Sequence, residues 1–146
     1  PIRPDAPGGV YEVVLPKVGG GTFALAQCRG KVMMLDFFVT WSQASMVAIP
    51  SYIVLSQKHP ATELCLVGIG LDDLGLQVID PFVRGLEVGY PVLVADERIR
   101  SGESLFGAMP AIPTLLIFDR RGELVQVFVG LVHPGRIEPV LRRLLP

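Results

Sequence analysis

Two serines stand three residues apart in the stretch Trp41-Ser42-Gln43-Ala44-Ser45, where a predicted helix follows a buried strand. Two cysteines at this spacing would exchange disulfides, because the N-terminus of a helix lowers the pKa of a thiol. The same field cannot turn a serine hydroxyl into a useful alkoxide near neutral pH, and two hydroxyls cannot store an electron pair. We therefore expect no redox activity from Ser42 and Ser45.

Serine hydrolysis is the other chemistry that these hydroxyls could perform. It needs a base within hydrogen-bond reach, usually a histidine that a third group orients. The only histidines, His59 and His133, are predicted at the far end of a helix and in a late loop. Asp36 is a conceivable base, but a buried carboxylate is more often a satisfied polar group. Hydrolysis is not expected, and neither is a metal site or another cofactor, because the histidines have no ligand-spaced neighbours.

The chain contains two cysteines, Cys28 and Cys65, which lie 37 residues apart outside any CxxC or metal-ligand spacing. We expect each of them to be a small, buried apolar residue. A disulfide or a reactive thiol is the alternative that the spacing leaves open.

Composition indicates one globular domain. The chain has 146 residues, half of them apolar, with a mean hydropathy of +0.49 and a net charge of −1. We assign residues 10–146 to a single domain and 1–9, rich in proline and glycine, to a flexible tether. The charge argues against nucleic acid as a partner. Because residue 1 is not Met, an export signal or lipid anchor could have been removed upstream, although a cloning boundary would explain it equally.

Hydrophobic periodicity predicts alternating strands and helices. The predicted elements are a hairpin over 10–16 and 22–26, a strand at 31–39, a helix at 42–58, a strand at 62–70, a helix at 74–88, a strand at 91–95, a short helix around 98–107, a hairpin of strands at 114–118 and 123–130, and a C-terminal amphipathic helix. Ser42 is predicted to cap the helix at 42–58. Pro139 fits the last helix only if it lies in the first turn.

This order, a βαβ unit followed by ββα, predicts an α/β thioredoxin-like fold. Its central mixed sheet would carry helices on both faces, with an N-terminal hairpin.

Three segments carry a resemblance to the TlpA/ResA branch of thioredoxin-like thiol–disulfide oxidoreductases. They are GKVMMLDFFVTWSQAS (30–45), FVRGLEVGYPVLVAD (82–96) and SLFGAMPAIPTLLIFDRRGELVQVFVG (104–130). In order and at the right spacing, they cover the chain from about residue 5 to the end. The resemblance implies that 82–96 is the helix–strand insertion of that branch. It also implies an exported, periplasmic or membrane-anchored protein, although a cytoplasmic location stays open.

The resemblance also implies roles for individual residues. Ser42 falls on the attacking cysteine of that branch, Ser45 on the resolving cysteine, and Asp36 on a buried carboxylate that accepts a proton in thioredoxins. Trp41 flanks the site, and Pro113 falls on the cis-proline. Ile112 offers the backbone that pairs with an extended peptide of a protein partner.

Three departures accompany the serines, namely Ala44, Met46 and Ala48, which make the region more apolar than family members. The sequence therefore predicts an oxidoreductase domain whose redox cysteines are serines, a degenerate active site that is redox-inactive as sequenced. The serines are either native or engineered replacements of cysteine. The alternative is a non-catalytic binding module that holds a peptide or protein at Trp41, Ile112 and Pro113.

Overall fold

A five-stranded mixed sheet forms the centre of the protein in the computed structural model, which describes residues 9–146. The strand order is β5-β4-β3-β6-β7. The strands are β3 (Val32–Phe38), β4 (Leu64–Gly70), β5 (Val92–Val94), β6 (Thr114–Phe118) and β7 (Leu124–Val129). β3 is parallel to β4 and antiparallel to β6. All seven residues of β3 are buried, as a central strand covered on both faces requires.

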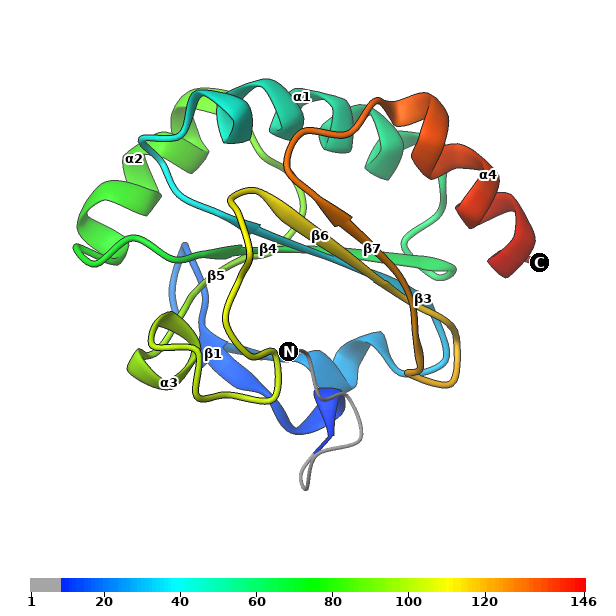
Figure 1. Ribbon diagram of the computed structural model, residues 1–146, viewed down its shortest axis with the longest axis horizontal. Coiled ribbons are helices and arrows are strands. Elements are labelled where there is room, and N and C mark those ends of the chain that lie inside the picture. The colour runs from blue at the N-terminus through cyan, green and yellow to red at the C-terminus, as the bar shows by residue number, and fades with distance from the viewer. Residues whose placement is uncertain (1–8) are drawn as a thin grey trace.

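The three long helices cover one face of this sheet (Figure 1). They are α1 (Gln43–Lys58), α2 (Leu76–Leu86) and α4 (Pro134–Leu144). Met34 of β3 packs with Tyr52 of α1 and Leu141 of α4, and Phe38 packs with Ile79 of α2. Alternate residues of β3 therefore bury the apolar stripes of the helices.

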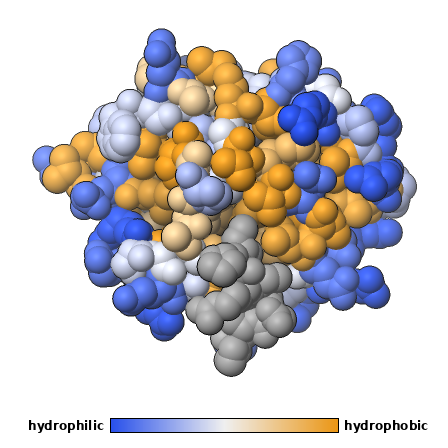
Figure 2. All heavy atoms as spheres, in the orientation of Figure 1, coloured by the Kyte–Doolittle hydropathy of each residue, from blue (hydrophilic) through white to orange (hydrophobic). Residues whose placement is uncertain are grey.

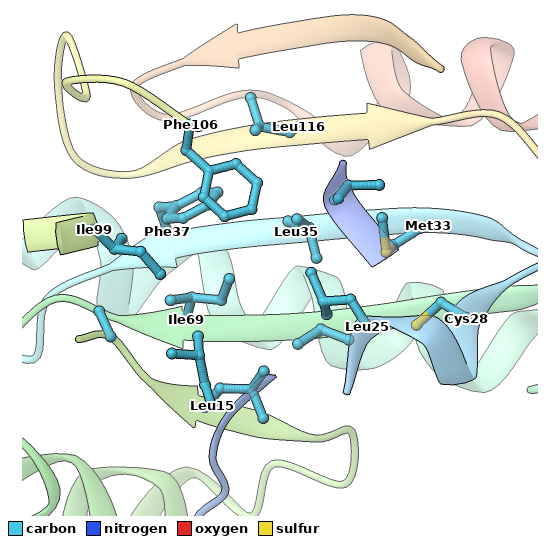
Figure 3. Packing of buried hydrophobic residues seen from close by; sticks show 14 of the residues in the cluster. Leu15, Leu25, Cys28, Met33, Leu35, Phe37, Ile69, Ile99, Phe106 and Leu116 are labelled. Carbon is cyan, nitrogen blue, oxygen red and sulfur yellow. The ribbon is translucent and has the colours of Figure 1, made fainter. Parts of the chain in front are cut away.

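Shorter elements cover the opposite face. They are the 3-10 helices η1 (Val10–Glu12) and η2 (Leu25–Cys28), the hairpin of β1 (Val14–Pro16) and β2 (Thr22–Ala24), and α3 (Glu97–Arg100). Figure 3 shows Leu25 and Cys28 facing Met33 and Leu35 on this side of the sheet. The predicted α/β thioredoxin-like fold, with helices on both faces, is confirmed.

Some boundaries differ from the prediction. α3 ends at Arg100, with Ser101 as its C-cap, and Gly102 then adopts a φ of 82°. Pro139 lies inside α4, beyond its first turn, so that prediction is wrong. The carbonyl that loses its partner is that of Gly135, an exposed residue that water can reach. A flexible tether was predicted at 1–9, and residues 1–8 of it lie outside the part of the chain that the structure describes.

Candidate functional site

Ser42 is the N-cap of α1, as predicted. Its Oγ accepts a hydrogen bond from the Ser45 backbone N–H at 3.2 Å, and its carbonyl accepts from the Met46 N–H. Ser45 is buried, and its Oγ has no hydrogen-bond partner among the described residues. The two serines therefore begin α1 at the edge of the sheet where β3 ends.

Trp41 and Pro113 lie at the same end of the central strands, because Trp41 follows β3 and Pro113 precedes the antiparallel β6. β3 ends at Phe38, Phe37 pairs with Thr114, and Pro113 immediately precedes Thr114. The Ile112–Pro113 peptide bond is cis, which confirms the prediction, and the Pro113 carbonyl accepts from the Gly130 N–H at 2.7 Å. Trp41 is 80% exposed. We call Trp41, Ser42, Ile112 and Pro113 the Trp41 surface.

Sequence reasoning missed Asp72, which holds the loop that carries Trp41. Asp72 is buried, and its carboxylate accepts from the Thr40 N–H at 3.1 Å and from the Thr40 hydroxyl at 2.7 Å. Because β3 and β4 are parallel neighbours, the loops that follow them lie side by side at the same end of the two strands. An acidic residue directly after the buried run 64–71 was the available signal.

Asp36 lies in the middle of β3, on the face covered by α1. It is fully buried, and neither carboxylate oxygen has a hydrogen-bond partner among the described residues. Loss of solvent raises the pKa of this carboxyl from 3.8 to about 7. Burial, with a contribution from the Asp36 charge, also raises the pKa of Tyr52 and of Tyr90. The Asp36 charge therefore acts on two tyrosines, the buried Tyr52 of α1 and the partly buried Tyr90 before β5.

The two cysteines are joined. Cys28 at the end of η2 and Cys65 in β4 form a disulfide with an S–S distance of 2.06 Å and a Cα–Cα distance of 5.6 Å. Residues 29–31 return the chain from η2 to β3, where Met33 pairs with Cys65. Because Met33 lies beside Cys65, the short connection at 29–31 places Cys28 against β4, the strand that contains Cys65, although the two cysteines are 37 positions apart in sequence.

Three predictions are corrected by this disulfide. The expectation that Cys28 and Cys65 are separate buried apolar residues is wrong. The interpretation of the chain as redox-inactive with a degenerate active site is also wrong, because its premise was that Ser42 and Ser45 hold the only redox positions, whereas Cys28 and Cys65 form a sulfur pair. The non-catalytic binding module shared that premise and is wrong with it. A disulfide between η2 and β4 has no local sequence motif, so the spacing of the two cysteines could not reveal it.

An open cavity of about 290 Å³ lies beside Cys65. β5 pairs with β4 only from Gly68 onward, so the outer edge of β4 at 64–66 is left without a neighbouring strand. We call this cavity the Cys65 pocket, and its polar lining comprises Gln27, Lys31, Ser56 and Tyr90. Cys65 is partly exposed, whereas Cys28 is completely buried.

The Cys65 pocket and the Trp41 surface are separate. Met33, the pairing partner of Cys65, lies near the beginning of β3, whereas Trp41 follows its end. The five residue-to-residue steps from Met33 to Phe38 span about 16 Å of extended strand. The described residues contain no cluster of three or more His, Cys, Asp or Glu side chains that could hold a metal.

Comparison with known proteins gives consistent likenesses. The chain is 25% identical over 143 residues to the thiol–disulfide oxidoreductase ResA of Oceanobacillus iheyensis, covering 97% of this chain and 71% of that protein. It superposes with a TM-score of 0.78 on a thioredoxin-family thiol:disulfide interchange protein of Chlorobium tepidum, at 24% identity over 90% of this chain and 92% of that one. For the exposed lipoprotein thioredoxin Etrx1 of Streptococcus pneumoniae, the TM-score is 0.74 at 20% identity, over 90% of this chain and 98% of that one.

No protein-family model matches the chain. The solved structures share its fold, and the curated relatives extend the likeness along nearly the whole sequence. The chain thus has a thioredoxin-like fold and is similar in sequence to the ResA-type thiol–disulfide oxidoreductases.

Proposed function

We propose that this protein is a thiol–disulfide oxidoreductase that acts on protein thiols, and that its redox pair is Cys28–Cys65. The observation that carries the proposal is the disulfide itself, whose Cys65 borders an open pocket while Cys28 is buried. Thiol–disulfide exchange needs one sulfur that a substrate can reach and a second sulfur that resolves the mixed disulfide. The two cysteines divide these roles by exposure.

The reaction transfers two electrons. In the reduced protein, the Cys65 thiolate attacks a substrate disulfide, forms a mixed disulfide and releases one substrate sulfur as a thiolate. The Cys28 thiolate then attacks the Cys65 sulfur and releases the second substrate thiolate, so Cys28–Cys65 is oxidised and the substrate gains two electrons. Two protons pass from the cysteines to the substrate thiols.

The position of Cys28 favours reduction of the substrate as the direction of transfer. Cys28 is completely buried in an apolar cluster with Leu25 and Met33. Such a setting disfavours the Cys28 thiolate, which makes the oxidised pair the more stable form. The dithiol is therefore expected to give up its electrons to more oxidising substrate disulfides.

We also propose that the Trp41 surface holds an extended segment of the protein substrate. Ile112 precedes the cis-proline in the loop just before β6, and its backbone groups can pair with an added extended segment. Met46 lies in the first turn of α1, and Leu131 follows Gly130, whose N–H bonds to the Pro113 carbonyl; both apolar side chains are exposed. Figure 2 shows hydrophobic side chains gathered across the middle of one face of the molecule. Ser42, Ser45 and Asp36 occupy the positions of catalytic groups in the family that the chain resembles, Ser45 and Asp36 being buried, while electron storage belongs to the cysteines.

The disulfide supports a compartment outside the cytoplasm, because structural and redox disulfides persist mainly in oxidising compartments. None of the helices in the described part of the chain is long and apolar enough to cross a membrane. Export is therefore part of the proposal.

Insulin reduction tests the proposed function. We expect the protein to catalyse it in the presence of a small thiol, and Cys28→Ser or Cys65→Ser each to lower the rate to the uncatalysed level. Ser101→Ala, at the exposed C-terminal end of α3 and outside the lining of the Cys65 pocket, serves as a matched control. Absence of turnover by the folded wild-type protein would refute the proposal.

A further inference from the structure

We propose that the Cys65 pocket binds low-molecular-weight thiols that carry a carboxylate, and that these thiols supply electrons to the Cys28–Cys65 pair. The inference rests on the proposed function, because it names the small-molecule side of the same exchange. It is carried by the size of the cavity, by its charge and by the sulfur at its wall.

The dimensions of the pocket favour a small molecule. Its volume of about 290 Å³ is at the lower end of small-ligand sites, which span about 300–1,000 Å³. It opens where β5 stops short of β4, so one side is formed by η2 and the residues after it, and the other by α1 and the loop before β5. A free amino-acid-sized thiol fits a space of this volume beside Cys65.

The charge of the pocket favours an anion. Lys31 is the one charged side chain among its lining residues, and no Asp or Glu joins it there in the described chain. Gln27, Ser56 and Tyr90 supply neutral hydrogen-bonding groups around it. An ammonium beside neutral donors suits a carboxylate, and it also favours the thiolate form of a sulfur held nearby.

Each exchange cycle at this pocket consumes two small thiols. The first thiolate attacks the Cys65 sulfur, the Cys28–Cys65 bond breaks, and Cys28 leaves as a thiolate that takes up a proton. A second small thiolate attacks the mixed disulfide on the small-molecule sulfur and releases Cys65. The products are one small-molecule disulfide and the dithiol protein, which carries the two electrons that the small thiols have lost.

Rates of reduction by paired thiols test the proposal. The oxidised protein is treated with 3-mercaptopropionate or with 2-mercaptoethanol, and the ratio of the two rate constants is compared with the ratio for the guanidinium-unfolded chain. The unfolded chain corrects for the intrinsic reactivities of the two thiols. We expect folding to shift the ratio toward the carboxylate by up to about fivefold, as one partly screened charge contact allows.

Lys31→Gln should return the ratio to that of the unfolded chain. Lys58→Gln is the matched control and should leave the ratio unchanged, because Lys58 lies at the end of α1 and pairs with Glu138. In the Cys28→Ser variant, a carboxylated small disulfide should form a mixed disulfide on Cys65, detected by peptide mass.

Equal ratios in the folded and unfolded chains, or an unchanged ratio in Lys31→Gln, would overturn the inference. If insulin is still reduced in that case, the proposed function stands without this substrate class. If the folded chain reacts with neither thiol and does not reduce insulin, both proposals fail.

Discussion

Asp36 is the residue whose chemistry the fold changes most. Its buried carboxyl has a pKa raised to about 7, whereas in the unfolded chain the value is near 3.8. A raised folded pKa gives stability that is fully present below the unfolded pKa and is lost as the pH rises through the folded pKa. The free energy of unfolding should therefore decrease as the pH rises from about 4 to about 7.

The Asp36→Asn variant tests this effect. We expect it to remove the fall and to raise the free energy of unfolding at pH 8 by at most about 4 kcal/mol relative to the wild type. At pH 4 the two proteins should differ little, because the wild-type carboxyl is then neutral. Urea unfolding at both pH values is the measurement, and equal pH profiles for the two proteins would contradict the account.

Trp41 offers a second prediction at the residue scale. Because its side chain is 80% exposed at the Trp41 surface, Trp41→Glu should raise KM for insulin about tenfold and leave kcat within about twofold. Val125→Glu is the control. Val125 is 43% exposed and lies at the beginning of β7, whereas the other end of β7 pairs with Thr114, next to Pro113. If both variants change KM equally, the Trp41 surface does not hold the substrate.

At the scale of single elements, α1 depends on the cap at its first turn. Ser42→Ala should lower the free energy of unfolding by about 1 kcal/mol, because the Ser45 N–H loses its acceptor. Ser42→Asp restores an acceptor and a favourable charge at the helix N-terminus, so it should stay close to the wild type. Urea unfolding distinguishes the two, and similar losses in both variants would show that the hydrogen bond contributes nothing.

Local sequence patterns predicted most of the elements. The unbroken apolar run of β3 and the capping residue of α1 are local signals, and the structure confirms both. Pro139 was misjudged because the carbonyl it leaves unpaired is exposed, which depends on the position of α4. The fold and the cis Ile112–Pro113 bond followed from the resemblance together with the element order.

The Cys28–Cys65 bond could not be predicted in the same way. It depends on the register of β3 against β4 and on the return of η2, neither of which any local pattern specifies. The Thr40–Asp72 contact has the same origin, because it joins loops that follow two different strands.

Across the whole molecule, the disulfide fastens the N-terminal layer to the sheet. It links η2 to β4 across 37 positions of the chain. By the chain-entropy relation, a loop of this length contributes about 4 kcal/mol through the unfolded state. The Cys28→Ala/Cys65→Ala double variant should lose about that much free energy of unfolding.

Wild-type protein reduced with dithiothreitol is the comparison for this loss in urea unfolding. Because reduction removes the same covalent link without changing the sequence, it should produce a similar decrease. A decrease in the double variant with none after verified reduction would assign the effect to side-chain packing.

The central claim is that Cys28 and Cys65 carry the electron pair, and a single-turnover transfer tests it most directly. The reduced protein is mixed with an equimolar disulfide-bonded protein substrate, quenched with acid, and both partners are weighed by mass spectrometry. The account predicts that the chain loses two hydrogen atoms as its disulfide forms, while the substrate gains two. A chain that stays folded and fully reduced beside an unchanged substrate would contradict it.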